Sequence, residues 1–151
     1  MLNNGLLKGK RGIILGVANN RSIAWACAEL FAAEGAELAF SFLGPAQEKR
    51  LKELAGNIPG SMIYPCDLSK DEEINAFVSS VKQKWDSIDF IIHSAAYADK
   101  EDLKGKFVNT SRANFAMALD VSAYSLVGVT RACEDMFKNG GSIVAMSYYG
   151  A

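Results

Sequence analysis

Short apolar runs alternate with longer segments of helical periodicity along the chain. The first run, Gly12–Val17, reads GIILGV; it is too short for a buried helix and is typical of a central strand in a parallel sheet, where both faces are covered. Other short runs have the same character. We therefore expect strands at Gly12–Val17, Glu37–Phe42, Met62–Tyr64, Phe90–His93 and Ser142–Met146.

The segments between these runs carry apolar residues at helical spacing. Glu72–Lys84 has the pattern of a helix lying on a sheet, with its apolar face formed by Ile74, Phe77, Val78 and Val81. In Ser22–Glu34, which Gly35 terminates, the expected buried side carries Ile23, Cys27, Leu30 and Phe31. The pattern predicts helices at Ser22–Glu34, Gln47–Leu54, Glu72–Lys84 and Ala113–Lys138, with mostly loop over Ser94–Val108.

A strand followed by a helix, repeated with short links, predicts parallel strands joined by right-handed crossovers. The sequence therefore indicates an α/β protein with a doubly wound parallel sheet of the Rossmann type, in which residues 1–151 form one dinucleotide-binding domain. We expect the strand order 3-2-1-4-5, because a nucleotide then lies across the crevice where the winding reverses.

Composition removes several classes of function. The formal net charge of −1 gives no broad basic field, so we expect no binding to nucleic acid or to a membrane surface. No apolar stretch reaches the roughly 18 residues of a membrane span, and residues 1–11 lack the apolar core of a signal peptide. The three cysteines are far apart and form no Cys-x-x-Cys pair, which favours free thiols in the cytoplasm and gives no indication of a metal site.

The turn after the first strand is the first candidate for cofactor binding. It runs from Gly16 to Ile23 and opens a helix, so free N–H groups and the positive helix end would face a pyrophosphate. The G-x-G-x-x-G spacing is absent, so this loop is wider than the usual fingerprint. Ser22 is a natural N-cap whose hydroxyl could bind either backbone or phosphate. The alternative is an ordinary connection between a strand and a helix.

Two more strand ends carry candidates. Asp67 follows the third strand, where its carboxylate could accept from an adenine amino group; the alternative is a loop acid or helix cap. Ser94, Ala95 and Ala96 follow the fourth strand, and such small residues let a flat ring approach the backbone; the alternative is tight packing. Because the candidates fall in the right order on these strand ends, their conjunction favours a dinucleotide site.

Four segments also carry a resemblance to known proteins: GVANNRSIAWACAELFAAEGAELAFSF, CDL, HSAAYA and SYYGA. They resemble the divergent branch of the short-chain dehydrogenase/reductase family, and within it the NADH-dependent enoyl-acyl carrier protein reductases of bacterial type II fatty acid synthesis. The resemblance covers Gly9–Ala151. Its most specific element is the wide G-x-x-x-x-x-S-I turn, because other short-chain reductases carry a glycine-richer loop.

The resemblance implies functional positions in this chain. Those on the cofactor side are, in chain order, Gly16, Ser22, Ile23, Leu43, Asp67, Leu68, Ser94, Ala95 and Val121. Among them, Asp67 and Leu68 match adenine contacts, and Ser94 and Ala95 lie near the nicotinamide-side ribose. Ala98 matches a substrate contact. Tyr148 matches the first of two family tyrosines near the acyl thioester and is the catalytic candidate of this chain, shaping the pocket and positioning the acyl group; Tyr149 has no such match.

The choice of cofactor depends on the resemblance. The family often has glutamine at Leu43, and no Asp or Glu stands there to hold a ribose 2′-hydroxyl. We expect NADH without excluding NADPH; Lys49 and Arg50 could meet a 2′-phosphate, although solvation is the simpler interpretation. The residues after His93 depart from the sequence that is commoner in the family. We interpret His93 as a strand-end histidine and not as a catalyst.

Family members continue with a second tyrosine in the spacing Tyr-x₆-Lys, which does not fit after Tyr148. Tyr97 and Lys104 have that spacing but precede the long helix, so we interpret the pair as coincidence. A sheet that stops at the fifth strand would leave an exposed apolar edge formed by Ile143, Val144 and Met146. We therefore expect the chain to be a piece of a longer protein, in which residues 1–151 are the dinucleotide-binding domain without its C-terminal part, and to be inactive as an enzyme by itself.

For the complete protein, the resemblance implies reduction of the trans-2 double bond of an enoyl thioester on acyl carrier protein. Hydride passes to the β-carbon, and a hydroxyl donor stabilises the charge that develops on the thioester oxygen, a role that the family assigns to the second tyrosine. One alternative is a short-chain reductase of carbonyl substrates, which would carry Tyr-x₃-Lys. Another is a non-catalytic nucleotide-binding module.

The expected helix at Ala113–Lys138 bears on assembly. It has more apolar residues than one face against the sheet needs: Phe115, Leu119, Val121, Tyr124, Val127 and Val129. The resemblance implies a homotetramer with this helix in a subunit interface. The alternative is a helix buried on two sides within one subunit.

Overall fold

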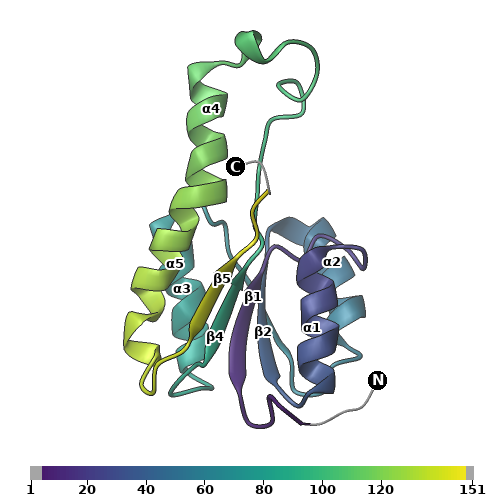
Figure 1. The fold of residues 1–151 in the computed structure, drawn as a ribbon, viewed down its shortest axis with the longest axis vertical. Helices are drawn as coiled ribbons and strands as arrows, with labels where there is room; N and C mark the ends of the chain where they lie inside the picture. The colour runs from purple at the N-terminus through teal and green to yellow at the C-terminus, as the bar shows by residue number, and fades with distance from the viewer. Residues whose placement is uncertain (1–4, 149–151) are drawn as a thin grey trace.

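The computed structural model describes residues 5–148, which form a five-stranded parallel sheet with helices on both faces (Figure 1). The order β3-β2-β1-β4-β5 confirms the predicted doubly wound Rossmann topology. The principal elements are β1 (Arg11–Leu15), α1 (Ile23–Ala33), β2 (Glu37–Phe42), α2 (Gly44–Ala55), β3 (Met62–Pro65), α3 (Asp71–Lys82), β4 (Phe90–His93), α4 (Arg112–Leu119), α5 (Ser125–Cys133) and β5 (Ser142–Ala145). Tyr149 lies outside the described residues.

Both faces of the sheet are covered, which explains the unbroken apolar run in β1. Ile14 packs into a cluster with residues of α1 and α2, whereas Ile13 and Leu15 pack into a cluster with residues of α3 and α5. Figure 1 shows these two helix pairs on opposite sides of the strands. The predicted face of α3 is confirmed, since its buried residues are Ile74, Phe77, Val78 and Val81.

The buried face of α1 differs from the prediction. Ile23 is 62% exposed and Leu30 is 47% exposed, while the buried residues of the helix are Ala24, Trp25 and Ala28. Of the expected face, Phe31 packs against the core cluster and Cys27 is half-buried, so the prediction was wrong for Ile23 and Leu30. α1 is apolar on most of its circumference, so periodicity does not single out one side. The two small alanines let the helix backbone approach the sheet closely.

The predicted helix at Ala113–Lys138 is also interrupted. α4 ends at Leu119, a π-helical turn spans Asp120–Tyr124, and α5 ends at Cys133. The Ser125 amide donates to the carbonyl of Asp120, five residues back, while the Ser125 hydroxyl donates to the Val121 carbonyl at 2.7 Å. The hydroxyl thus occupies the carbonyl that the same residue's amide would bind in an α-helix, and this local competition explains the wider turn.

Smaller differences concern other boundaries. α2 begins at Gly44 and not at Gln47, because Pro45 has the backbone angle of a first helical turn. The segment after β4 is irregular as predicted, apart from a short 3₁₀ turn at Phe107–Asn109. At the β5 edge, Ile143 and Val144 are exposed as expected, whereas Met146 is half-buried against the cluster that contains α1. No helix within residues 5–148 is long and apolar enough to cross a membrane.

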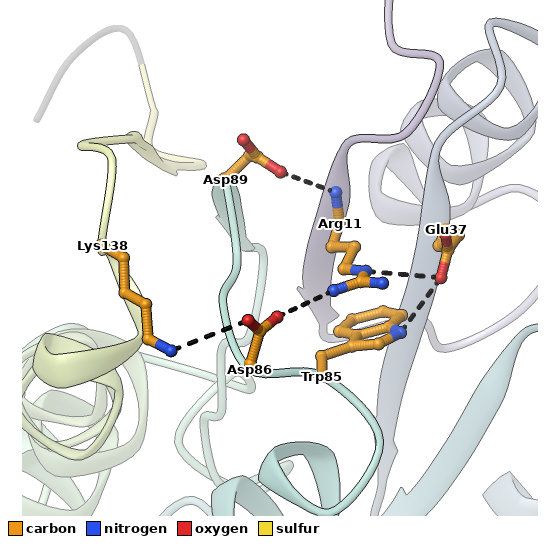
Figure 2. A network of polar contacts seen from close by, with 6 residues as sticks. All are labelled: Arg11, Glu37, Trp85, Asp86, Asp89 and Lys138. Carbon is orange, nitrogen blue, oxygen red and sulfur yellow. Dashed lines mark hydrogen bonds and ion pairs between the residues drawn. The ribbon is translucent and has the colours of Figure 1, made fainter.

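A polar network joins the amino ends of the strands (Figure 2), and its members are Arg11, Glu37, Trp85, Asp86, Asp89 and Lys138. The backbone amide of Arg11 donates to Asp89 at 2.9 Å, and its guanidinium donates to Asp86 at 3.1 Å. Glu37 lies 3.5 Å from the Arg11 Nε and accepts from the Trp85 indole at 3.1 Å. Because this network ties β1, β2 and the segment before β4 at the amino edge, it serves stability and leaves the carboxyl edge to ligands.

Candidate cofactor site

A cavity of about 490 Å³ opens at the carboxyl edge of the sheet. It is lined from the ends of β1, β2, β3 and β4, from α2, and from the helical segment that contains α4 and the π turn. Seven of the predicted cofactor residues line it: Gly16, Leu43, Asp67, Leu68, Ser94, Ala95 and Val121. Four other predicted residues are not among its lining residues: Ser22, Ile23, Ala98 and Tyr148.

Gly16 allows two strand ends to approach each other closely in this cavity. Its φ is +87°, in the left-handed region that favours glycine. A Cβ at this position would overlap the carbonyl of Ser94 and lie 2.7 Å from the Ala95 nitrogen. The turn after β1 therefore lies directly against the segment after β4, which is where a doubly wound sheet places its ligand crevice.

The rest of the first turn is held by its own polar groups. The Ser22 hydroxyl donates to the Asn19 carbonyl at 2.7 Å and accepts from the Trp25 amide at 3.4 Å, so it caps α1. The Asn19 side chain accepts from the Arg21 amide at 2.8 Å. The turn thus keeps a defined shape without the glycines of the usual fingerprint.

Gln47 is a lining residue that sequence reasoning missed. Its amide nitrogen donates to the Val17 carbonyl at 3.0 Å and its amide oxygen accepts from the Leu43 nitrogen, so it bridges the ends of β1 and β2. Arg50 donates to the Ala18 carbonyl at 3.4 Å, which brings one of the two basic residues considered for a 2′-phosphate to the rim of the same turn. A single polar residue in a helix has no periodic signal that would have identified it.

Asp67 both lines the cavity and organises its own loop. Its Oδ1 accepts from the Ser69 amide at 3.0 Å and from the Ser69 hydroxyl at 2.7 Å, while Lys70 lies 3.1 Å from Oδ2. Partial burial works to raise the pKa of Asp67, but these hydrogen bonds and the Lys70 charge outweigh it and hold the pKa below its usual value. The carboxylate is therefore ionised at neutral pH and acts as an acceptor.

The neighbouring Cys66 supplies an apolar wall. Burial raises the pKa of this thiol to about 12, so it stays protonated and is not a nucleophile at neutral pH. No three His, Cys, Asp or Glu side chains converge as metal ligands in the part of the chain that the structure describes.

The segment after β4 separates the predicted residues. Ser94 and Ala95 line the cavity together with Ala96 and Tyr97, whereas Ala98 is exposed beyond them. The exposed Lys104 lies 2.8 Å from Glu101, an ion pair within that loop. Tyr148, which follows β5, has 89% of its surface exposed.

His93 lies behind this segment, buried at 2% exposure, with Nε2 2.7 Å from the Ser125 hydroxyl. Burial disfavours the imidazolium and lowers the pKa of His93 below its ordinary value of 6.5. This environment fits the interpretation of a structural strand-end histidine.

The pH dependence of folding should report this burial. Below pH 6.5 the histidine is protonated in the unfolded chain, whereas burial keeps it neutral in the folded chain. The free energy of unfolding should therefore fall as the pH decreases from 6.5 to about 5. His93 is the one histidine in the sequence, so urea unfolding of a His93→Gln variant should show a flatter profile over this range. Equal slopes for the two proteins would contradict the assignment.

Residues 16–151 match the family described as enoyl-(acyl carrier protein) reductase. The chain belongs to this family. The match begins at Gly16 and includes each residue that lines the cavity.

Individual relatives are similar over nearly the whole chain. The NADH enoyl-(acyl-carrier-protein) reductase of Rickettsia conorii is 45% identical over 150 residues, which are 99% of this chain and 58% of that protein. The enoyl-(acyl-carrier-protein) reductase of Anaplasma phagocytophilum, solved in complex with NAD, superposes with a TM-score of 0.90 at 39% identity, covering 96% of this chain and 56% of that one. The Bacillus cereus enoyl-acyl carrier protein reductase, solved with NADP⁺ and indole naphthyridinone, gives a TM-score of 0.91 at 41% identity, covering 96% and 57%. The chain thus spans somewhat over half the length of these relatives.

Proposed function

We propose that the protein binds NADH in the cavity at the carboxyl edge and reduces the trans-2 double bond of enoyl thioesters carried by acyl carrier protein. One observation carries the proposal: residues at separate strand ends that the sequence predicts as cofactor contacts line one cavity in a member of the enoyl-(acyl carrier protein) reductase family. The relative from Anaplasma phagocytophilum, solved with NAD, supports the choice of cofactor.

The adenosine end of the cofactor is assigned to Asp67 and Leu68. The ionised Asp67 carboxylate accepts from the adenine amino group, and the Leu68 backbone N–H serves the ring. Gly16 lets the pyrophosphate approach the backbone at the turn before α1. Ser22 and Ile23 act from that turn, where Ser22 keeps the helix end capped and its N–H groups oriented.

The nicotinamide end is assigned to Ser94, Ala95 and Val121. The small residues after β4 let the ring lie against backbone, and Val121 forms the apolar wall from the π turn. NADH would supply the hydride for the β-carbon of the substrate, and the α-carbon would take a proton from water. Ala98 and Tyr148 are assigned to the acyl side, where Tyr148 shapes the substrate pocket.

Selectivity between NADH and NADPH is decided near Leu43 and Arg50. Leu43 offers no carboxylate to a ribose 2′-hydroxyl. Arg50 donates to the Ala18 carbonyl, so its guanidinium lies at the turn after β1, where it could meet a 2′-phosphate. The Bacillus cereus relative solved with NADP⁺ keeps the phosphorylated cofactor as the second candidate. Titration of the chain with both reduced cofactors, followed by their fluorescence, measures the preference; NADH is expected to bind more tightly.

Turnover distinguishes the proposed reaction from its alternatives. NADH oxidation is measured with crotonyl thioester and with acetoacetyl thioester, using the 151-residue chain and the product of the whole gene. Oxidation with the enoyl substrate alone supports the proposal, whereas oxidation with the ketone alone indicates a carbonyl reductase. Cofactor binding without turnover of either substrate by the whole gene product indicates a nucleotide-binding module.

Replacement of Asp67 by alanine should weaken NADH binding by about 1.5–3 kcal/mol, roughly 10- to 150-fold, because one hydrogen bond to a charged group is lost. Asp99 provides a matched control, since its Oδ1 accepts from the Glu101 amide at 2.8 Å in a similar turn and it does not line the cavity. Asp99→Ala should leave the affinity unchanged. Equal NADH affinities in calorimetry for wild type and Asp67→Ala would reduce Asp67 to a loop residue.

A homotetramer and a cytoplasmic location complete the proposal. Among the described residues, Phe115, Leu119, Tyr124 and Val127 remain 47–53% exposed on the helical segment from α4 to α5, so the chain's own fold does not bury them on a second side. A subunit interface would cover this apolar surface. Light scattering measures the assembly, and Val127→Asp should dissociate it.

The three free cysteines are consistent with a reducing compartment, which supports the cytoplasmic location.

A further inference from the structure

The long helix changes its winding where it passes the cavity. Asp120–Tyr124 forms the π turn, and Val121 from this turn lines the cavity together with Ser94 and Ala95. Single π turns within α-helices are found frequently at functional sites. The contacts that hold this turn therefore bear on the shape of the cavity.

One buried side chain, Ser125, binds the carbonyl of Val121, and a second, His93, binds Ser125. Ser125 Oγ donates to that carbonyl at 2.7 Å and lies 2.7 Å from His93 Nε2. A hydroxyl has one proton, which Ser125 gives to Val121, so Ser125 accepts from His93 and the imidazole carries its proton on Nε2. His93 is 2% exposed and Ser125 is 0% exposed, so no bulk water competes for these bonds.

A second contact ties the same turn to the loop after β4. Ser122 Oγ accepts from the Tyr97 amide at 3.0 Å and donates to the Tyr97 carbonyl at 3.3 Å. His93 and Tyr97 flank the segment 94–96, so the π turn is attached to the chain on both sides of that segment. Neither attachment includes the residues after β3, which lie beyond β1 and β2 in the sheet.

We propose that His93, Ser125 and Ser122 are positioning residues that set the width of the nicotinamide end of the cavity. They do so by holding the Val121 wall at a defined distance from the segment 94–96. The proposal rests on the proposed cofactor assignment. Loss of these bonds should therefore weaken the binding of the nicotinamide end while leaving the binding of the adenine end, at Asp67 and Leu68, unchanged.

The test compares NADH with AMP, which has the adenine end alone, in calorimetric titrations of the 151-residue chain. Wild type should bind both. Ser125→Ala and Ser122→Ala should weaken NADH binding about three- to tenfold, the range expected for one internal hydrogen bond, with unchanged AMP affinity. His93→Phe should behave like Ser125→Ala, whereas His93→Gln, whose amide can still donate to Ser125, should retain most of the NADH affinity.

Ser80 gives a matched control, because its hydroxyl donates to the Ala76 carbonyl four residues back at 3.0 Å in α3, away from the cavity. Ser80→Ala should change neither affinity. If folded Ser125→Ala and Ser122→Ala bind NADH like wild type, or lose AMP affinity equally, the positioning role is wrong. Ser122 is only partly buried, so Ser122→Ala decides the question should Ser125→Ala not fold. A wild-type chain that does not bind NADH would overturn the cofactor assignment instead, and this proposal with it.

Discussion

A Gly16→Ala variant should bind NADH at least about tenfold more weakly than wild type, a loss of ~1.4 kcal/mol or more. The added Cβ would overlap the Ser94 carbonyl, so the turn after β1 and the segment after β4 would have to separate. These are the two strand ends between which the pyrophosphate and the nicotinamide side of the cofactor are proposed to lie. Their separation would widen the cavity at its centre. NADH titration and urea unfolding measure the two consequences.

Gly60→Ala separates this effect from backbone strain. Gly60 also has a positive φ, +75°, but a Cβ there would meet nothing within 4 Å. In both variants the left-handed backbone strain should lower the free energy of unfolding by about 1–2 kcal/mol. Only Gly16→Ala adds the overlap with the Ser94 carbonyl. A folded Gly16→Ala protein with wild-type NADH affinity would show that the close approach at Gly16 has no role in cofactor binding.

The elements that could be predicted from the sequence are those whose pattern marks the buried surface clearly, either by one apolar face or by apolar residues on both faces. β1 is apolar throughout because both faces of the sheet are covered, and α3 has a single stripe against polar surroundings, so both were predicted correctly. α1 has apolar residues on most sides, and its face is chosen by how closely Ala24 and Ala28 let it approach the sheet. That choice depends on packing, which periodicity does not record.

The candidate site shows the same division. Asp67 and Ser94 could be located because they follow strands, and parallel strands bring their carboxyl ends to one edge. The π turn could not, because it depends on whether the hydroxyl or the amide of Ser125 reaches the Val121 carbonyl. Gln47 could not either, since its bridge between Leu43 and Val17 exists only once β1 and β2 lie side by side.

Replacement of Trp85 by alanine should lower the free energy of unfolding by about 3–5 kcal/mol, the usual cost of deleting a large buried aromatic side chain. Trp85 is 5% exposed and belongs to the core cluster that contains Val81 and Ile88. Its indole also donates to Glu37, and the Arg11 guanidinium carbon lies 6.0 Å from the ring centroid. Since domains are stable by only about 5–15 kcal/mol, this loss would remove a large part of the total.

Two variants divide the loss into packing and polar contributions. Trp85→Phe keeps an aromatic ring and removes the bond to Glu37. The lost hydrogen bond should lower the free energy of unfolding by about 1 kcal/mol, in addition to the cost of the smaller side chain. Glu37→Gln removes one charge of a partly exposed pair and should cost less than about 1 kcal/mol. Urea unfolding of the three variants gives these values; a Trp85→Ala loss no greater than that of Glu37→Gln would contradict the core role. Because Trp85 lies at the amino edge, folded Trp85→Phe should bind NADH like wild type, which separates the stability of this sheet from the site at its opposite edge.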